Sequence, residues 1–590
     1  MIQNLQLFCI LGLILFSACE SDSGIFIEAE SFTQKGGWIV DPQFVEQMGS
    51  PYLMAHGMGE PVVDAISQID ITESGIYYIW VRTLNWAPGP WEAPGLFTLS
   101  IGDKELANPL GKSEIWGWEK AGEIQLDPGE KILRLVDKTG FNGRCDAIWI
   151  SQDKTAPPSE KEKLNRWRKT QLGTQRIPET IKSFDLVVVG GGIAGCAAAI
   201  SAAEHGLKVA LVHDRPVLGG NASSEIRVHT LGIYGKFERI LKKLDTKHYP
   251  NGSPEAYEDE EKRHQHMKSY ENINLFLNWR AYNTETKGDQ ITAIDAQQTS
   301  SGEQMRFSAP YFVDCTGDGW IGYWAGAEYF YGRESVNTYN EGWEKFGEIW
   351  SPEVADDGVM GASVLWRTCT DDTISIFPSV PWAIEIAGSY AAKKGTWNWE
   401  FISLDYHQID DGEAIRDHML KAIIGSFYNE KQKPGNENLK LEWMSHLLGK
   451  RESRRLVGDH IYTFNDAREN REFADSVVVE IREVDVHYPQ NILNESIPDF
   501  LTDAMFYHAG RYYIPYRSLY SKDVENLFMA GRCFSCSHIG LGGPRVMLTT
   551  GQMGAAVGIA ASLSVKYKAT PRDIYNKHLE EYWELILAQQ

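Results

Sequence analysis

A glycine-rich turn between two apolar segments constrains this chain more than any other feature. Residues 184–189 (FDLVVV) have the length and β-branching of a buried parallel strand, and they lead directly into a Gly-x-Gly-x-x-Gly run at 190–195. An alanine-rich stretch at 196–205 predicts a helix, and 208–212 predicts a second strand that ends just before Asp214. Strand, glycines, helix and strand in this order predict a βαβ unit that binds a dinucleotide.

Each glycine of the run has its own mechanical reason. Gly190 permits the tight turn, Gly192 lets the backbone approach a pyrophosphate, and Gly195 lets the helix pack closely on the strand. The free N–H groups and the positive dipole at the start of the helix then attract the phosphates. The run therefore predicts the pyrophosphate site of a dinucleotide cofactor.

Three other segments resemble flavoproteins of the two-dinucleotide-binding-fold type. Residues 217–221 (VLGGN) supply a glycine pair after the second strand, and 311–320 (YFVDCTGDGW) resembles the hydrophobic strand and Ala-Thr-Gly-Asp box of that family. Residues 526–532 (NLFMAGR) and the glycine-rich segment after them resemble the last strand and helix of the flavin site. This resemblance implies that the dinucleotide is FAD.

More narrowly, the chain resembles a family of FAD-dependent oxidoreductases common in polysaccharide-degrading bacteria. The segments that carry this resemblance span about two thirds of the chain and are 214–228 (DRPVLGGNASSEIRV), 451–459 (RESRRLVGD), 514–519 (IPYRSL) and 531–547 (GRCFSCSHIGLGGPRVM). It implies an oxidoreductase that acts during polysaccharide breakdown.

Two positions depart from the wider flavoprotein pattern. His213 stands where a glutamate usually ends the second strand, so Asp214 is expected to bind the ribose hydroxyls instead. Arg532 stands where a Gly-Asp pair often contacts the ribityl chain. The residues expected to bind FAD are Gly190, Gly192, Gly195, Asp214, Arg215, Gly219, Gly220, Ala281, Gly317, Asp318, Gly531 and Arg532.

Four side chains are candidates for the chemistry beside the flavin. Oxidation of an alcohol needs a base for the hydroxyl proton, and histidine suits this near neutral pH. His538 is the first candidate, with a structural histidine as the alternative. Arg545 either stabilises negative charge on flavin or substrate, or forms a plain salt bridge. Arg227 and His229 either line the active site or form one polar face of a strand.

Residues 25–152 differ in character from the rest of the chain. Short alternating runs such as 75–82 (GIYYIWVR) are separated by Gly, Pro and Asp turns, which is typical of a β-sandwich. The opening IEAE at 27–30 resembles carbohydrate-binding modules of the sandwich type, and Trp86 and Trp91 are candidates for a sugar platform. Alternatively, this domain is a lid that packs against the flavin domain.

The flavin motifs divide the remaining sequence. We predict a linker at 153–180, an FAD-binding domain at 181–320 and 510–566, a mixed α/β substrate insertion at 321–509, and a C-terminal helix at 567–590. The expected fold class is a Rossmann-like α/β FAD-binding domain with a mixed α/β insertion, preceded by an all-β sandwich.

The N-terminus is typical of an export signal. Residues 5–18 form an apolar run too short for a bilayer span, and 16–19 read FSAC. Small residues before a cysteine resemble a lipoprotein signal, which implies removal of residues 1–18 and lipidation of Cys19. We therefore expect an exported lipoprotein held at the cell envelope by a membrane anchor, with a periplasmic protein and an ordinary signal peptide as the alternative.

Composition limits the partners. The net charge of −23 argues against nucleic acid, whose phosphates would be repelled. Paired Cys-x-x-Cys or His-x-x-x-His elements are missing from the sequence, so no zinc site is predicted. Cys533 and Cys536 form a single Cys-x-x-Cys, which is either a redox dithiol or a pair of small residues packed beside the cofactor.

These observations lead to an expected function. We expect an exported FAD-dependent oxidoreductase that oxidises a carbohydrate hydroxyl during polysaccharide degradation. One alternative is a flavin-dependent reductase of an activated double bond, which needs an acid rather than a base beside the flavin. The other is a carbohydrate-binding surface flavoprotein without turnover.

Overall fold

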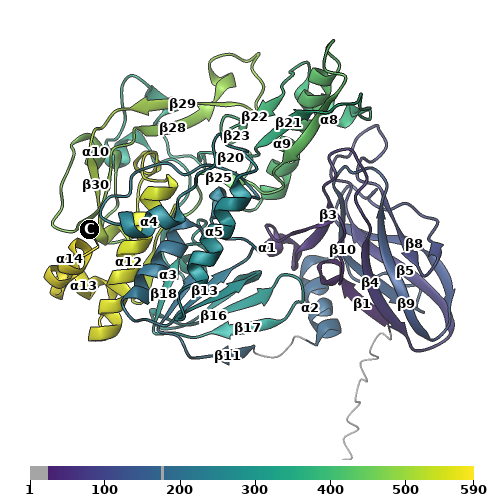
Figure 1. Cartoon of the computed structure of the whole chain (residues 1–590), viewed down its shortest axis with the longest axis horizontal. Helices are drawn as coiled ribbons and strands as arrows, with labels where there is room; N and C mark the ends of the chain where they lie inside the picture. Colours follow the sequence, from purple (N-terminus) through teal and green to yellow (C-terminus); the bar gives the residue numbers. More distant parts are fainter. Residues whose placement is uncertain (1–23, 174–177, 590) are drawn as a thin grey trace, which may run out of the picture.

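The glycine-rich turn lies in a parallel sheet of five strands (Figure 1). The computed structural model describes residues 24–173 and 178–589. The strands in their order across the sheet are β14 Ile273–Leu277, β13 Val209–His213, β12 Leu186–Val189, β18 Tyr311–Asp314 and β31 Leu527–Met529. The central strands are continuous buried apolar runs, as expected of a parallel sheet covered on both faces.

Two helices rich in small residues pack beside this sheet. Helix α3 (Ile193–Glu204) contacts α12 (Met547–Tyr567) along much of its length. A Cβ at Gly554 would lie 2.0 Å from the carbonyl oxygen of Ala194, so this close approach requires glycine. Within the described residues α12 alone is long and apolar enough to span a membrane, and it lies buried inside the protein as a core helix. Sheet and helices confirm the Rossmann-like α/β fold class.

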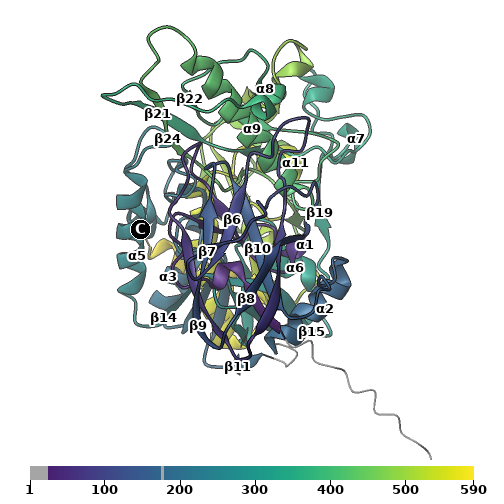
Figure 2. The same ribbon diagram turned by 90° about the vertical axis from the view of Figure 1, so that its right-hand side faces the viewer.

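The N-terminal part of the chain is an all-β sandwich, as predicted, and lies in front of the α/β part in Figure 2. We call residues 24–151 the sandwich. One sheet contains β1 Gly24–Glu28, β2 Ile39–Asp41, β3 Tyr52–Ala55, β5 Gly75–Thr83, β8 Gly117–Leu126 and β10 Gly143–Ser151. The other contains β4 Ala65–Ile71, β6 Phe97–Ile101, β7 Lys104–Glu105 and β9 Gly129–Asp137. Apolar side chains from both sheets form one buried core.

The segment expected to be a linker contains a helix that packs on the sandwich. Helix α2 (Lys161–Leu172) places the Trp167 ring edge-on against Phe26 and Trp149, with centroids 4.9 and 5.1 Å apart. Arg168 of the same helix is buried and forms an ion pair with Asp146. One tryptophan and one arginine therefore anchor a segment whose composition is otherwise polar.

The insertion is built from several small sheets, short helices and one long helix rather than from one large sheet. The elements that concern the site are β20 Ala362–Ser363, α8 Pro381–Ala387, β23 Glu400–Phe401, α9 Gly412–Lys431, β25 Gly449–Lys450, β28 Val484–Pro489 and β29 Thr502–Tyr507. At the C-terminus two helices, α13 Pro571–Lys577 and α14 Leu579–Leu587, replace the single helix expected there.

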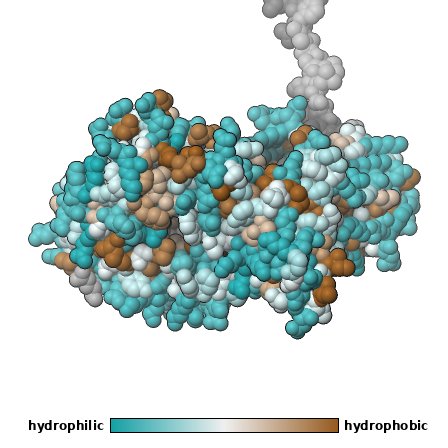
Figure 3. Space-filling model, turned by 90° about the horizontal axis from the view of Figure 1, so that it is seen from above, coloured by the Kyte–Doolittle hydropathy of each residue, from teal (hydrophilic) through white to brown (hydrophobic). Residues whose placement is uncertain are grey.

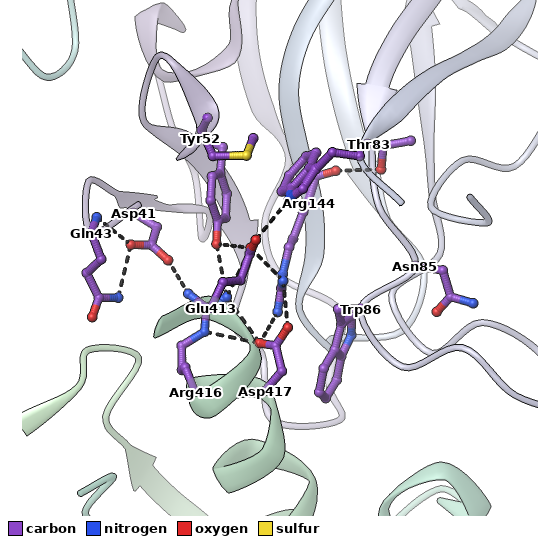
Figure 4. Close-up of polar contacts among 12 residues, drawn as sticks. Asp41, Gln43, Tyr52, Thr83, Asn85, Trp86, Arg144, Glu413, Arg416 and Asp417 are labelled. Carbon is purple, nitrogen blue, oxygen red and sulfur yellow. Dashed lines mark hydrogen bonds and ion pairs between the residues drawn. The ribbon is translucent and has the colours of Figure 1, made fainter. Parts of the chain in front are cut away.

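Helix α9 joins the insertion to the sandwich through buried charges (Figure 4). Arg144 on β10 donates a hydrogen bond to Glu413 at 2.8 Å, and Arg416 of the helix forms an ion pair with Asp41. Both guanidinium groups are fully buried. Because buried charges are tolerated only with good partners, these pairs fix the sandwich in one position on the insertion.

Away from these contacts, the face seen in Figure 3 is mostly hydrophilic, with hydrophobic residues in small separate groups. Single exposed apolar side chains are ordinary on a protein surface.

Candidate functional site

One cavity of about 530 Å³ joins the glycine-rich turn, the insertion and the sandwich. Its walls include Gly192 at the turn, His487 from β28 and Glu46 from the sandwich. We call it the cofactor cavity. Three parts of the chain that are far apart in sequence therefore contribute to one site.

The glycine-rich turn has the shape that a bound pyrophosphate needs. Gly190 has φ +106°, and a Cβ there would lie 2.2 Å from the carbonyl oxygen of Cys315. A Cβ at Gly195 would lie 1.8 Å from the carbonyl oxygen of Gly190, so this glycine serves packing rather than cofactor contact. At Gly192 the nearest atom would be 3.9 Å away, which leaves open space before the N-terminus of α3. The residues present fit a dinucleotide.

The end of β13 differs from the expected ribose site. His213 accepts a hydrogen bond from the Gly191 N–H at 3.0 Å through Nδ1, and its Nε2 lies 3.0 Å from the carbonyl oxygen of Val217. Burial lowers the pKa of His213 to about 4, so the ring is neutral and both nitrogens serve the local backbone. Asp214 lines the cavity and lies 3.2 Å from Arg280.

A charged group forms the middle of the cavity. Asp318 lies between Lys450 and Arg532, at 2.9 and 3.3 Å. Burial raises the pKa of Asp318, but the two cations outweigh it and hold the pKa well below its usual value. Within the described part of the chain, the Arg532 Nε is buried without a hydrogen-bond partner, so it remains available to a ligand.

Most residues predicted to bind the cofactor line this cavity. They are Gly190, Gly192, Asp214, Arg215, Gly219, Gly220, Ala281, Gly317, Asp318, Gly531 and Arg532, whereas Gly195 lies behind the turn. Gly317 and Gly531 have φ of +77° and +102°, which explains glycine at both positions.

A cluster of charged side chains lines another part of the cavity. We call Arg451, Arg482, Asp485, His487 and Arg545 the polar cluster. Asp485 is bound by Arg545 at 2.7 Å and by Arg482 at 2.8 Å. The Arg482 Nε is buried and has no hydrogen-bond partner among the described residues. Arg451 pairs with Glu400 instead, at 3.3 Å, so three guanidinium groups face two carboxylates and the excess positive charge favours an anionic ligand.

His487 is held by a buried carboxylate. Its Nδ1 lies 2.6 Å from Glu400 Oε2, and Thr502 donates to the same oxygen at 2.7 Å. Burial raises the pKa of Glu400, but Arg451 and His487 outweigh it and lower the pKa to about 2. Glu400 is therefore a carboxylate that accepts the Nδ1 proton. In the neutral ring this leaves the lone pair on Nε2, which lies 3.9 Å from Asp485 Oδ2.

Of the four candidate catalytic residues, two line the cavity and two do not. Arg545 and His229 line the cavity, and burial lowers the pKa of His229. Arg227 does not line it: its guanidinium stacks 4.2 Å over Trp443 and its Nε donates to the carbonyl oxygen of Ser224. Arg227 is thus a buried packing residue, 4% exposed.

The expectation for His538 also needs correction. His538 is 2% exposed, does not line the cavity, and has Nδ1 2.8 Å from Glu452 in a buried ion-pair network. The Ser537 hydroxyl caps the short helix α11 (His538–Leu541), which directs the histidine into this network. The histidines that line the cavity are His213, His229 and His487.

The tryptophans proposed as a sugar platform lie at the contact between sandwich and insertion. Trp86 is 4% exposed, donates to the carbonyl oxygen of Phe141, and packs edge-on against Trp382 with centroids 5.0 Å apart. Trp91 is half-buried and donates to the carbonyl oxygen of Ala87. This loop therefore packs the sandwich against the insertion, which fits the alternative of a packing domain better than an exposed sugar platform.

The structure places both cysteines of the Cys-x-x-Cys motif in the protein interior. Cys533 and Cys536 are free and buried, and burial raises the pKa of both thiols well above its usual value. Such thiols stay protonated and unreactive, which favours the packing interpretation.

Within residues 24–173 and 178–589, no group of three or more His, Cys, Asp or Glu side chains could hold a metal ion.

Several site residues carried no signal in the sequence. Asp485 and His487 lie in a strand whose alternating pattern, VDVHYP, is that of an ordinary β-strand, and Glu400 lies in the separate short strand β23. Glu46 lies in a short helix of the sandwich and Arg280 in a strand at the edge of another sheet. Only tertiary contacts bring them together, so a motif search had nothing to detect.

Comparisons with known proteins agree with this site. The FAD dependent oxidoreductase family matches residues 185–582. A fumarate reductase (cytochrome) from Shewanella frigidimarina is 40% identical over 165 residues, which is 28% of this chain and 24% of that protein. The chain thus matches about a quarter of the length of this curated relative.

Two solved structures are similar at low identity. A geranylgeranyl bacteriochlorophyll reductase-like protein from Thermoplasma acidophilum is 11% identical, with a TM-score of 0.32, over 70% of this chain and 84% of its own. A CBM35 from Paenibacillus barcinonensis is 16% identical, with a TM-score of 0.19, over 22% of this chain and all of its own. Because the family match covers more than half of the chain, FAD as cofactor and an enzymatic role are confirmed, and the protein belongs to the FAD dependent oxidoreductase family.

Proposed function

We propose that this enzyme oxidises a hydroxyl group of an acidic carbohydrate, such as a uronic acid, during polysaccharide degradation. The observation that carries the proposal is that His487, held by Glu400, lines the same cavity as the FAD-binding turn. FAD supplies the hydride-accepting chemistry, so the protein needs a base for the hydroxyl proton. We assign this role to His487 Nε2, because Nδ1 is held by Glu400 and Nε2, 3.9 Å from Asp485, is the nitrogen left for a substrate hydroxyl.

The substrate class follows from the other side chains of the polar cluster. Arg451 and Arg545 bring guanidinium groups to the cavity beside His487, and guanidinium binds a carboxylate in a two-pronged geometry. Trp397 and Phe506 also line the cavity and are 40% and 46% exposed. Exposed aromatic faces beside charged groups suit a sugar ring that carries a carboxylate.

Flavin reduction by candidate substrates tests this proposal. The purified protein is mixed under anaerobic conditions with uronic acids, the matching neutral sugars and oligosaccharides, and the visible flavin absorbance is followed. We expect bleaching by acidic sugars, weaker bleaching by neutral ones, and loss of both in His487→Gln. Unchanged flavin with every sugar would contradict the proposal. If the isolated sandwich then binds sugar, the protein is a binding flavoprotein instead.

A second candidate is reduction of an activated double bond in a carboxylate substrate. The polar cluster contains three arginines, which is more than one carboxylate needs, and the relative from Shewanella frigidimarina is a fumarate reductase. The test is the reverse reaction: dithionite-reduced enzyme is mixed with fumarate and with unsaturated uronic acids. Rapid reoxidation of the flavin by these compounds, without bleaching by saturated sugars, favours this function.

The proposed location is the cell envelope, through a lipid on Cys19. Residues 1–23 lie outside the described part of the structure, so the support is the apolar run and the FSAC sequence. Incorporation of labelled fatty acid into the wild-type chain and its loss in Cys19→Ala is the expected result. A protein released from the periplasm without label indicates an ordinary signal peptide.

A further inference from the structure

The ribose site at the end of β13 lacks its usual acceptor. A carboxylate normally accepts the hydrogen bonds of the adenosine ribose hydroxyls at this point of a dinucleotide fold. His213 stands at this position, and its two ring nitrogens already contact Gly191 and Val217. Asp214 follows it, with Oδ2 held 3.2 Å from Arg280; its Oδ1 lies 3.3 Å from His213 Nδ1, which accepts from the Gly191 N–H and has no proton to donate.

A glutamate of the sandwich reaches the same place. The connection between β2 and β3 carries the short helix α1 (Val45–Met48), which extends from the sandwich toward the parallel sheet (Figure 1). Glu46 of this helix lines the cofactor cavity, and its Oε2 lies 2.5 Å from Arg280. Arg280 thus links Glu46 to Asp214, beside the end of β13.

One oxygen of Glu46 has no protein partner. Its Oε1 is buried and makes no hydrogen bond among the described residues. A buried carboxylate oxygen without a donor is costly, so it indicates that a ligand supplies the missing hydrogen bonds. The ribose hydroxyls are donors of the right kind, and Glu46 lies in the cavity wall where they would be.

The connection that carries Glu46 is firmly held. Gln43 accepts a hydrogen bond from the Leu448 N–H at 2.9 Å and donates to the carbonyl oxygen of His446 at 3.2 Å. Phe44 is 4% exposed, and the Arg416 Cζ atom lies over its ring, 4.9 Å from the ring centroid. Glu46 is therefore presented by a rigid element, as a binding residue must be.

We propose that Glu46 binds the 2′ and 3′ hydroxyls of the adenosine ribose of FAD, in place of the strand-end glutamate. Arg280 holds the carboxylate in position through its second oxygen. The sandwich is then part of the cofactor site itself rather than an appended domain. This inference concerns FAD binding alone and is independent of the substrate proposed above.

Nucleotide binding to the flavin-free full chain tests the inference. Calorimetry measures the affinities of ADP, 2′-deoxy-ADP and 3′-deoxy-ADP for the wild type and for Glu46→Gln. The wild type should bind ADP about tenfold more tightly than the deoxy compounds, since hydrogen bonds to a charged group are strong. Glu46→Gln should bind all three alike. Glu123→Gln, an exposed sandwich carboxylate paired with Lys120, is the matched control and should keep the preference.

Flavin binding separates a direct contact from a structural one. Glu46→Gln should bind FAD about tenfold more weakly and FMN, which lacks the adenosine, as the wild type does. A variant that keeps the ADP preference, or that weakens FAD and FMN equally, shows that Glu46 is only an ion-pair partner of Arg280. Loss of the preference in Asp214→Asn but not in Glu46→Gln would likewise overturn the proposal.

Discussion

Arg144 of the sandwich donates two hydrogen bonds to the Asp417 carboxylate of helix α9, at 2.5 and 2.9 Å (Figure 4). The arginine is fully buried, so its removal leaves Asp417 without its main partner. We predict that Arg144→Met lowers the free energy of unfolding by about 3 kcal/mol, because the Asp417 and Glu413 carboxylates are left to share one cation, Arg416. Urea unfolding followed by tryptophan fluorescence measures this loss.

An exposed ion pair of the same domain is the control for that prediction. Lys138 and Glu105 lie 2.6 Å apart with side chains 37% and 50% exposed. Lys138→Ala should change the free energy of unfolding by less than about 1 kcal/mol, since solvent screens the pair. Equal effects of the two substitutions would show that the buried pair does not hold the sandwich in place.

Gly192→Ala separates folding from cofactor binding. Gly192 has an ordinary φ of −70°, and a Cβ there would lie 3.9 Å from its nearest neighbour. The variant should therefore fold with wild-type stability, yet its methyl group occupies the path of the pyrophosphate. We predict at least a tenfold loss of FAD affinity, measured by flavin fluorescence on titration.

Gly554→Ala is the matched comparison, because there the added methyl group meets the protein itself, 2.0 Å from the carbonyl oxygen of Ala194. This variant should lose stability as well as FAD. Wild-type FAD affinity in Gly192→Ala would mean that the pyrophosphate does not approach this glycine.

The local part of the site could be predicted from the sequence, and the distant part could not. The βαβ unit is specified by contiguous residues, so strand, turn and helix were found, although α3 begins at Ile193 inside the glycine motif rather than after it. The pairing of His487 with Glu400 and of Glu46 with Arg280 depends on how separate segments pack. The motif beside His538 in the sequence favours it as a candidate base, yet its side chain is buried against Glu452 away from the cavity, which the motif does not reveal.

His213 gives the protein a defined dependence on pH. Burial lowers its pKa to about 4, below the value of about 6.5 in an unfolded chain. The unfolded chain therefore binds the extra proton between these values, and the free energy of unfolding falls as the pH drops from about 6.5 to about 4. Above this window His213 contributes no change. At most about 3 kcal/mol is involved.

Urea unfolding of wild type and His213→Asn at several pH values measures this contribution. Asparagine keeps an acceptor for the Gly191 N–H but does not titrate. The stability of the variant should therefore fall less than that of the wild type between pH 6.5 and 4. Identical pH dependence in both proteins would show that His213 is not the titrating group.

His487 should control the rate of flavin reduction by the substrate, because it is the side chain proposed to accept the hydroxyl proton. His487→Gln should lower this rate by about a hundredfold or more, since glutamine can form a hydrogen bond but cannot take the proton. Glu400 stays ionised across the neutral range, because its pKa is about 2.

Glu400→Gln tests whether the carboxylate orients the ring. The amide accepts a hydrogen bond as well but carries no charge, so the positive charge that forms on His487 during proton transfer loses its partner. We expect an intermediate loss of rate, smaller than that of His487→Gln, because the imidazolium that forms is no longer stabilised by a carboxylate. Stopped-flow flavin reduction with the sugar that bleaches the wild type measures this loss. His508→Gln, an exposed histidine outside the cavity, should leave the rate unchanged, and a similar loss there would remove the case for a base at His487.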